Sequence, residues 1–150
     1  MIYTVLSVRQ PWAYCIIKGY KDLENRTWKT DYRGQLAIHS SSSFDFSFLD
    51  FLNAPPEWEP INNYADEICA FFGIGEKRRI TAHKDHLSAV LGTVNLKDCV
   101  EAPEEAIEAD PIGNPWCMYT GFAWMLDGAK AFREPITGIK GKLNLWKLEV

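Results

Sequence analysis

The chain has 150 residues, of which 47% are hydrophobic and 24% are charged, a balance typical of one globular domain rather than of a disordered or fibrous protein. No apolar run is long enough to span a membrane and the first residues carry no basic leader, so we expect a soluble, cytoplasmic domain without a membrane partner. The formal net charge of −4 argues against a long phosphate-binding surface and favours a local contact if the ligand is a nucleic acid.

The first 40 residues predict short elements in quick succession. A helix is expected over residues 11–18, because Pro11 suits a first helical turn and Gly19 can end the helix in the left-handed conformation. Extended segments rich in β-forming residues are expected on both sides of this helix, with a turn at residues 31–34: residues 2–8, 23–28 and 35–40.

The middle of the chain has a different composition and predicts two helices inserted between strands. Ser42 and Ser43 can cap the first, and Asn62 and Asn63 can cap the second, which would end at Gly73. A Pro-Pro pair at residues 55–56 separates the two. The first helix would carry the apolar residues Phe44, Phe48, Leu49, Phe51 and Leu52.

The second half returns to strands, expected at residues 89–100, 121–126 and 141–150, with Gly92, Gly128 and Gly141 suited to bulges or bends. This order of elements predicts a mixed α+β domain built on a small curled or closed sheet.

Neither cysteine nor histidine spacing indicates a metal site or a cofactor. The cysteines lie far apart among apolar neighbours, which is typical of reduced core thiols: Cys15, Cys69, Cys99 and Cys117. His83 and His86 lack a nearby cluster of further ligands and are expected in an exposed polar loop. His39 stands in an apolar strand, where we expect a core histidine bonded to a neighbour.

Arg9 and Gln10 stand at the predicted junction of the first strand and the helix. Arginine offers a fork of donors for a phosphate or a carboxylate, and glutamine can donate to and accept from the edge of a base. The helix N-terminus adds backbone N–H groups that favour an anion. Trp12 lies one residue further into the helix, either as a ligand contact or as a side chain packed on the core.

Charged residues continue beyond the helix. Glu24 and Arg26 would share one face of a regular strand with Trp28, whereas Lys21 needs an irregular entry to the strand to reach that face. If the face is buried, its charges must be paired, so an ion pair of Glu24 with Arg9 or with Arg26 is the structural alternative to a ligand site.

Four segments resemble the ASCH domain family: LSVRQPWA (residues 6–13), GYKDLENRTW (19–28), YRGQLAIHS (32–40) and IKGKLNLW (139–146). The resemblance implies a PUA-like fold similar to domains that bind RNA, with a cleft beside the first helix. The fold class it implies is α+β, a small PUA-like mixed β-barrel spanning residues 1–150 as one domain. A short helix would follow the first strand, and a helical insertion would occupy residues 41–75.

One enzymatic branch of that family hydrolyses acetylcytidine with the lysine and threonine of a G-x-K-x-x-T-x-R motif and a later glutamate. In this frame Lys21 and Arg26 match, and Glu24 stands where the threonine nucleophile is expected. A carboxylate is no alcohol nucleophile, although it could act as a general base toward water. The later glutamate has three candidates by position: Glu101, Glu104 and Glu105.

Three hypotheses follow. The first is a module that binds a nucleotide or a single-stranded RNA end, with Trp116 or Trp28 stacked on a base. The second is an amidohydrolase acting on a modified nucleoside such as acetylcytidine, with Lys21 and Glu24 as catalytic residues, or a ribonuclease using the same cleft. The third is a protein-interaction domain. The predicted ligand-binding residues are Arg9, Gln10, Trp12, Lys21, Glu24, Arg26 and Trp116.

Overall fold

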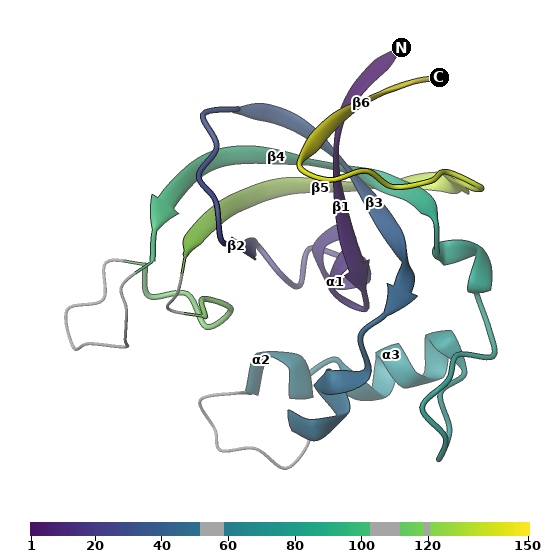
Figure 1. Cartoon of the computed structure of the whole chain (residues 1–150). Coiled ribbons are helices and arrows are strands. Elements are labelled where there is room, and N and C mark those ends of the chain that lie inside the picture. Colours follow the sequence, from purple (N-terminus) through teal and green to yellow (C-terminus); the bar gives the residue numbers. More distant parts are fainter. Residues whose placement is uncertain (52–58, 103–111, 119–120) are drawn as a thin grey trace.

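A computed structural model describes residues 1–51, 59–102, 112–118 and 121–150. The fold is α+β, and a strongly curled sheet arches over a short helix, α1 (Trp12–Ile17), with further helices on the other side of α1 (Figure 1). The sheet has six strands: β1 (Ile2–Gln10), β2 (Leu23–Arg26), β3 (Gly34–Phe44), β4 (Ala89–Glu101), β5 (Phe122–Ile136) and β6 (Leu145–Glu149).

The strand order is β2-β5-β4-β3-β1-β6, in which only β1 and β3 run parallel. The predicted closed barrel is wrong, because within the described ranges β2 and β6 are edge strands that do not pair with each other. The curl nevertheless brings β2 close to β1, and a side chain closes the gap: Nη2 of Arg26 donates to the carbonyl oxygen of Ser7 at 2.8 Å. A four-residue strand offers too few ladder bonds to complete a barrel.

Helix α1 is buried on two sides, which explains its almost uniformly apolar sequence. Ala13 and Ile16 pack in the core beneath the sheet. Tyr14 and Cys15 face a second apolar cluster that includes the helix α3 (Ala65–Phe72). The prediction for this helix is confirmed, since Pro11 and Lys18 flank it and Gly19 takes the left-handed φ of 79°.

The helical insertion differs from the prediction in its first half. Phe44 still belongs to β3, and a 3₁₀ helix, η1 (Phe46–Phe51), follows. Asp45 and not Ser42 or Ser43 caps it, because Oδ1 of Asp45 accepts from the amide of Ser47 at 2.9 Å. Serine hydroxyls in an extended backbone cannot reach the amides of that turn. The predictions for Leu52 and for the Pro-Pro pair lie outside the described residues.

The second half of the insertion contains α2 (Glu59–Asn62) and α3. The predicted Asn62 and Asn63 cap is wrong, since the residue before α3 is Tyr64 and no side chain caps it. The predicted end is confirmed, because Gly73 closes α3 in the left-handed conformation with φ of 62°. Farther along the chain lies a second 3₁₀ turn, η3 (Lys84–His86).

The later strands confirm the expected positions but not all lengths. β4 begins at Ala89 as predicted, whereas β5 extends ten residues beyond the predicted end at Leu126. β5 keeps pairing with β4 past Leu126 through shifts of register near Gly92 and Gly128. These two bulges let a long strand follow a curled sheet.

His39 and the cysteines lie in the environments predicted for them. His39 is fully buried, its Nδ1 lies 2.9 Å from Oγ of Ser7, and its Nε2 lies 2.7 Å from the carbonyl oxygen of Ile139. The four cysteines are free thiols, and all but the half-buried Cys69 are buried. None of the helices in the described ranges is long and apolar enough to cross a membrane.

Candidate functional site

Lys21 owes its inward orientation to the turn that follows α1. The backbone amides of Tyr20 and Lys21 both donate to the carbonyl oxygen of Cys15, at 2.9 and 3.0 Å. This turn supplies the irregular entry that the sequence required, and the Lys21 side chain becomes 95% buried. Its Nζ donates to the carbonyl oxygen of Leu23 at 2.5 Å and to Oε1 of Glu24 at 3.2 Å.

Glu24 lies on β2, opposite Trp124 of β5, and bridges two cations. Its Oε1 accepts from Lys21 and from the amide of Asn25 at 3.1 Å, and its Oε2 accepts from Nη2 of Arg26 at 3.0 Å. Burial by itself would raise the pKa of the carboxyl, but the charges and hydrogen bonds of Lys21 and Arg26 hold this pKa below its ordinary value. Glu24 is therefore a carboxylate whose two oxygens are both engaged.

The ion pair predicted for Glu24 forms with Arg26 and not with Arg9. Arg26 is three-quarters buried, and its Nε has no hydrogen-bond partner among the residues that the structure describes. A buried donor without a partner costs free energy, so this guanidinium is positioned to gain from an added acceptor.

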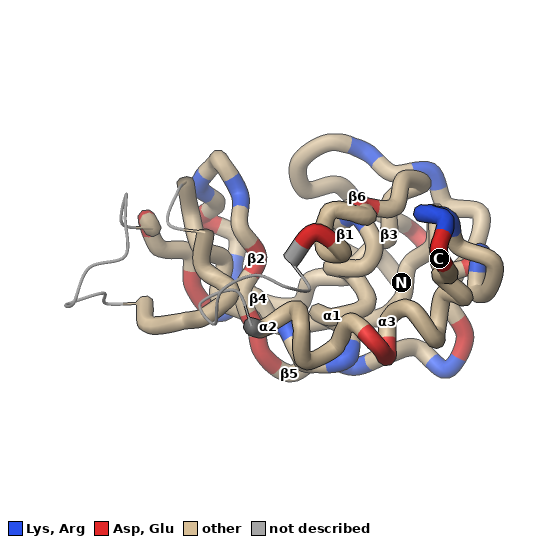
Figure 2. Tube along the Cα trace, turned by 90° about the horizontal axis from the view of Figure 1, so that it is seen from below, with Lys and Arg blue, Asp and Glu red and all other residues tan. Residues whose placement is uncertain are grey.

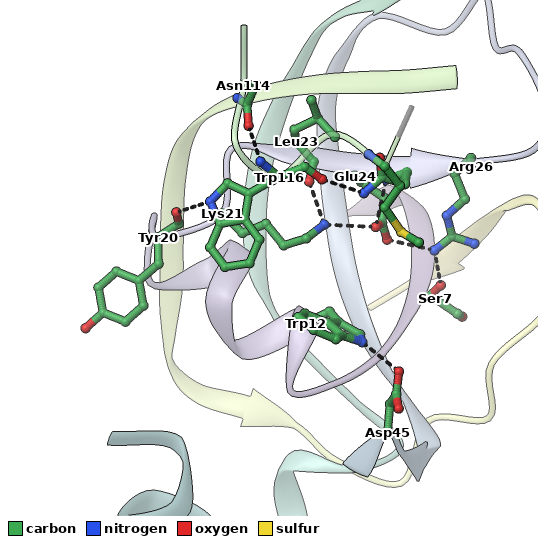
Figure 3. Close-up of polar contacts among 12 residues, drawn as sticks. Ser7, Trp12, Tyr20, Lys21, Leu23, Glu24, Arg26, Asp45, Asn114 and Trp116 are labelled. Carbon is green, nitrogen blue, oxygen red and sulfur yellow. Dashed lines mark hydrogen bonds and ion pairs between the residues drawn. The ribbon is translucent and has the colours of Figure 1, made fainter. Parts of the chain in front are cut away.

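Lys21 and Glu24 line a hollow of about 320 Å³, here called the aromatic hollow, to which Trp12 and Trp116 both contribute. Figure 3 shows these four side chains together. Nε1 of Trp12 donates to Oδ2 of Asp45 at 3.0 Å, and Nε1 of Trp116 donates to the carbonyl oxygen of Tyr20 at 3.0 Å. Both indoles are thus fixed through their only polar atom. Nζ of Lys21 lies 6.0 Å from the centre of the Trp116 ring, within the range of a cation–π contact.

Asn25 ties the segment that carries Trp116 to β2. Its Nδ2 donates to the carbonyl oxygen of Trp116 at 2.9 Å, and its Oδ1 accepts from the amide of Met118 at 3.0 Å. Oδ1 of Asn114 in turn accepts from the amide of Trp116 at 2.9 Å. Residues about 90 positions apart in the sequence thereby form one wall.

A second hollow of about 560 Å³ adjoins the first, and we call it the arginine hollow because Arg9 and Arg26 line it. The two hollows share Trp12, Glu24, Asn25 and Asp45. Burial would raise the pKa of Asp45, but its hydrogen bonds from Ser47 and Trp12 and the charge of Arg9 lower it, so the carboxylate stays ionised. Figure 2 shows basic and acidic positions interspersed over the described trace.

Of the predicted ligand-binding residues, the structure brings together all but Gln10 in these two hollows. Gln10 is fully buried: its Oε1 accepts from the amide of Tyr14 at 2.8 Å, and its Nε2 donates to the carbonyl oxygen of His86 at 3.0 Å. It therefore satisfies the start of α1 instead of facing a hollow.

The remaining candidates lie elsewhere. Trp28 packs edge-on against Trp124, with ring centres 4.7 Å apart, and contributes only to the arginine hollow. Glu101 is exposed at the end of β4 and lines neither hollow. Glu104 and Glu105 lie outside the described residues.

Sequence reasoning missed several residues that line the aromatic hollow: Asp45, Ser47, Pro60, Ile61, Pro115 and Met118. An Asp-x-Ser spacing at residues 45–47 is typical of a helix cap and could have identified Asp45. Nothing in the local sequence marks Ile61 or Met118, because both reach the hollow only through the packing of distant segments.

No group of three or more His, Cys, Asp or Glu side chains in the described ranges is arranged to hold a metal ion. A family model described as the ASCH domain matches residues 6–123, a range that includes α1, β2 and both hollows. The chain belongs to the ASCH domain family. That family is linked to RNA binding, and the ASCH domain of this chain contains the entire Lys21, Glu24 and Arg26 cluster.

Two curated relatives carry the name activating signal cointegrator 1. The human protein is 26% identical over 157 aligned residues, and the mouse protein is 26% identical over 145. Each alignment covers 96% of this chain but 22% of the relative, so the ASCH domain described here spans about a fifth of their length.

Proposed function

We propose that this ASCH domain binds a nucleotide or the end of a single-stranded RNA, with a base in the aromatic hollow and a phosphate in the arginine hollow. The observation that carries the proposal is the direct junction of the two hollows. One is bordered by two fixed indoles, the other by two guanidinium groups, and Glu24 and Asp45 lie between them. A nucleotide has the same division into a flat apolar ring and an anionic group.

The aromatic hollow suits a base for two reasons. Its surface is mostly apolar, and indole rings fixed by hydrogen bonds lose little entropy when a base stacks on them, an interaction worth about 1–3 kcal/mol per base. Lys21 adds a specific donor, since its ammonium group has three N–H bonds and the described contacts use two. The third can meet an acceptor on the edge of a base.

The arginine hollow suits a phosphate. Arg9 is exposed and its side chain makes no hydrogen bond to any described residue, whereas Arg26 is held by Ser7 and Glu24 with its Nε unsatisfied. Ser41 and Ser43 also line this hollow, and serine hydroxyls can donate to phosphate oxygens. One or two phosphates fit this arrangement better than a long strand does, in keeping with the negative net charge.

The same geometry weighs against catalysis by Glu24. A general base works best with a pKa near the working pH, whereas the pKa of Glu24 is lowered and both of its oxygens already accept hydrogen bonds. We therefore favour binding over hydrolysis of a modified nucleoside or cleavage of RNA.

Isothermal titration calorimetry with 5′-nucleotides, nucleosides and RNA of two to six residues tests the proposal. Arg9→Ala is expected to weaken every phosphate-bearing ligand by a similar factor and to lower the slope of log K against log salt by about 0.7, the value for one phosphate contact on a single strand. Nucleoside binding should not change. Arg133→Ala, on the exposed part of β5, is the matched control and should behave as the wild type.

Absence of binding throughout the panel would refute the proposal, as would equal effects of the two arginine substitutions. The enzymatic alternative has its own assay: acetylcytidine and short RNAs are incubated with the wild type and with Glu24→Gln, and products are separated by chromatography. Turnover that disappears in Glu24→Gln, at a temperature at which this variant is still folded, would replace binding by catalysis as the function of the site.

A further inference from the structure

A third hollow, distinct from the two described above, lies beside Trp116. It has a volume of about 270 Å³ and shares Pro60, Pro115 and Trp116 with the aromatic hollow. Its other lining residues come from the turn after α1, the start of α3 and the segment before Trp116: Tyr20, Asp22, Asn63, Tyr64 and Asn114. One indole therefore contributes to two neighbouring hollows.

The rings of Tyr64 and Trp116 are nearly parallel, with an angle of 14° between their planes and 6.3 Å between their centres. This distance is that of an interacting aromatic pair. The two rings therefore form one continuous aromatic border of the third hollow, on which a base can stack.

Both rings are held in place by contacts with Tyr20. Tyr64 stacks on Tyr20 with ring centres 4.1 Å apart and 3° between the planes, and the hydroxyl of Tyr20 donates to Oε1 of Glu67 at 2.8 Å. Trp116 is held through Nε1, which donates to the backbone of Tyr20. The pair is thus a preorganised aromatic border that does not have to be assembled by the ligand.

The polar residues of this third hollow suit the edge of a base and not a phosphate. Nδ2 of Asn114 donates to Oδ1 of Asp22 at 2.8 Å, so the rim carries a carboxylate that would repel an anion. That carboxylate and the amide of Asn63 can accept from exocyclic amino groups. Arg9 and Arg26 line the arginine hollow and Lys21 lines the aromatic hollow, whereas no lysine or arginine is among the described residues that line the third hollow.

We propose that the third hollow binds the base adjacent to the one in the aromatic hollow, stacked on its border of Tyr64 and Trp116, so that Trp116 stands between two consecutive bases of a single-stranded RNA. This inference rests on the proposed function and narrows its ligand from a mononucleotide to a strand of two or more residues. Single-strand binding proteins commonly stack successive bases on aromatic side chains in this way.

Calorimetry with matched ligands tests the inference, using the 5′-phosphorylated dinucleotides pApA, pCpC and pUpU with the corresponding 5′-mononucleotides. The wild type should bind at least one dinucleotide about tenfold tighter than its mononucleotide, the gain expected from one further stacked base. Tyr64→Leu should lose this gain and retain the mononucleotide affinity, whereas Tyr64→Phe should keep both. Tyr3→Leu, which removes a half-buried tyrosine on β1, is the control for loss of an aromatic ring.

A gain that persists in Tyr64→Leu, or no gain in the wild type, would overturn the inference while leaving the mononucleotide site intact. If no ligand binds, the proposed function itself fails. Should Tyr64→Leu not fold, nuclear Overhauser contacts between base protons of a bound dinucleotide and the Tyr64 ring of the wild type support the inference, and their absence refutes it.

Discussion

Replacing Glu24 by Gln keeps the size of the side chain and removes the charge that holds two cations. Lys21 is 95% buried and would lose its carboxylate partner, and the new amide would present N–H groups toward one of the two cationic donors. Breaking a buried ion pair from one side costs roughly 3–5 kcal/mol, because the remaining charge stays buried without compensation. For a chain of this size, a loss of about 3 kcal/mol lowers the melting temperature by roughly 6–12 °C.

Urea unfolding of the wild type, Glu24→Gln, Lys21→Met and the double variant measures this cost and the coupling between the two sites. We expect each single variant to be strongly destabilised. The double variant should lose less stability than the sum of the two single variants, since it removes both members of the pair. A loss below about 1 kcal/mol for Glu24→Gln, or additive effects, would refute the view that buried charge dominates this cluster.

The pH dependence of the stability difference between the wild type and Glu24→Gln follows from the lowered pKa of Glu24. A carboxyl whose pKa is lower in the folded than in the unfolded state contributes stability above its unfolded pKa of about 4.3, and that contribution is lost as the pH falls through the folded value. The stability difference between the wild type and Glu24→Gln should therefore be constant from pH 7 to pH 5 and shrink below about pH 4.3.

Three further predictions concern stability. Burial lowers the pKa of His39. The wild type should therefore lose stability as the pH falls below about 6.5. A His39→Gln variant that lost as much free energy of unfolding as the wild type between pH 7.5 and 5.5 would contradict this. An added Cβ at Gly92 would lie 2.1 Å from the carbonyl oxygen of Lys130, whereas one at Gly75 meets nothing within 4 Å; Gly92→Ala should cost about 1–3 kcal/mol in chemical unfolding, and Gly75→Ala under about 0.5. Asp45→Ala removes the cap of η1 and the partner of Trp12, and a melting curve indistinguishable from the wild type would contradict the expected loss of about 1 kcal/mol.

Elements defined by neighbouring residues could be predicted from the sequence. Helix α1 lies where proline and glycine signals predict it, and the spacing of Glu24 and Arg26 on one strand face is enough to pair them. The capping residue of η1 could not be chosen in the same way. Serines and aspartate compete for that role within four positions, and the choice depends on where β3 ends, which its pairing with β1 decides.

The aromatic hollow marks the limit of local reasoning. The sequence identified Trp12, Lys21 and Trp116 individually, but nothing local shows that Asn25 binds the backbone of Trp116 or that Ile61 lines the same hollow. Gln10 is the opposite case. Its amide side chain, which can both donate and accept, suggested base recognition. Only the position of His86, 76 residues away, explains why this amide is used inside the core.

The sequence by itself determined the α+β class, the start and end of α1, and the charged cluster after it, because short-range sterics, capping and strand periodicity act over a few residues. The tertiary structure decided that the sheet stays open, which indoles border the hollows, and that Trp116 contributes to two of them. Those features depend on segments that meet only after the chain has folded, where packing and hydrogen bonding between distant residues determine which side chains remain free for a ligand.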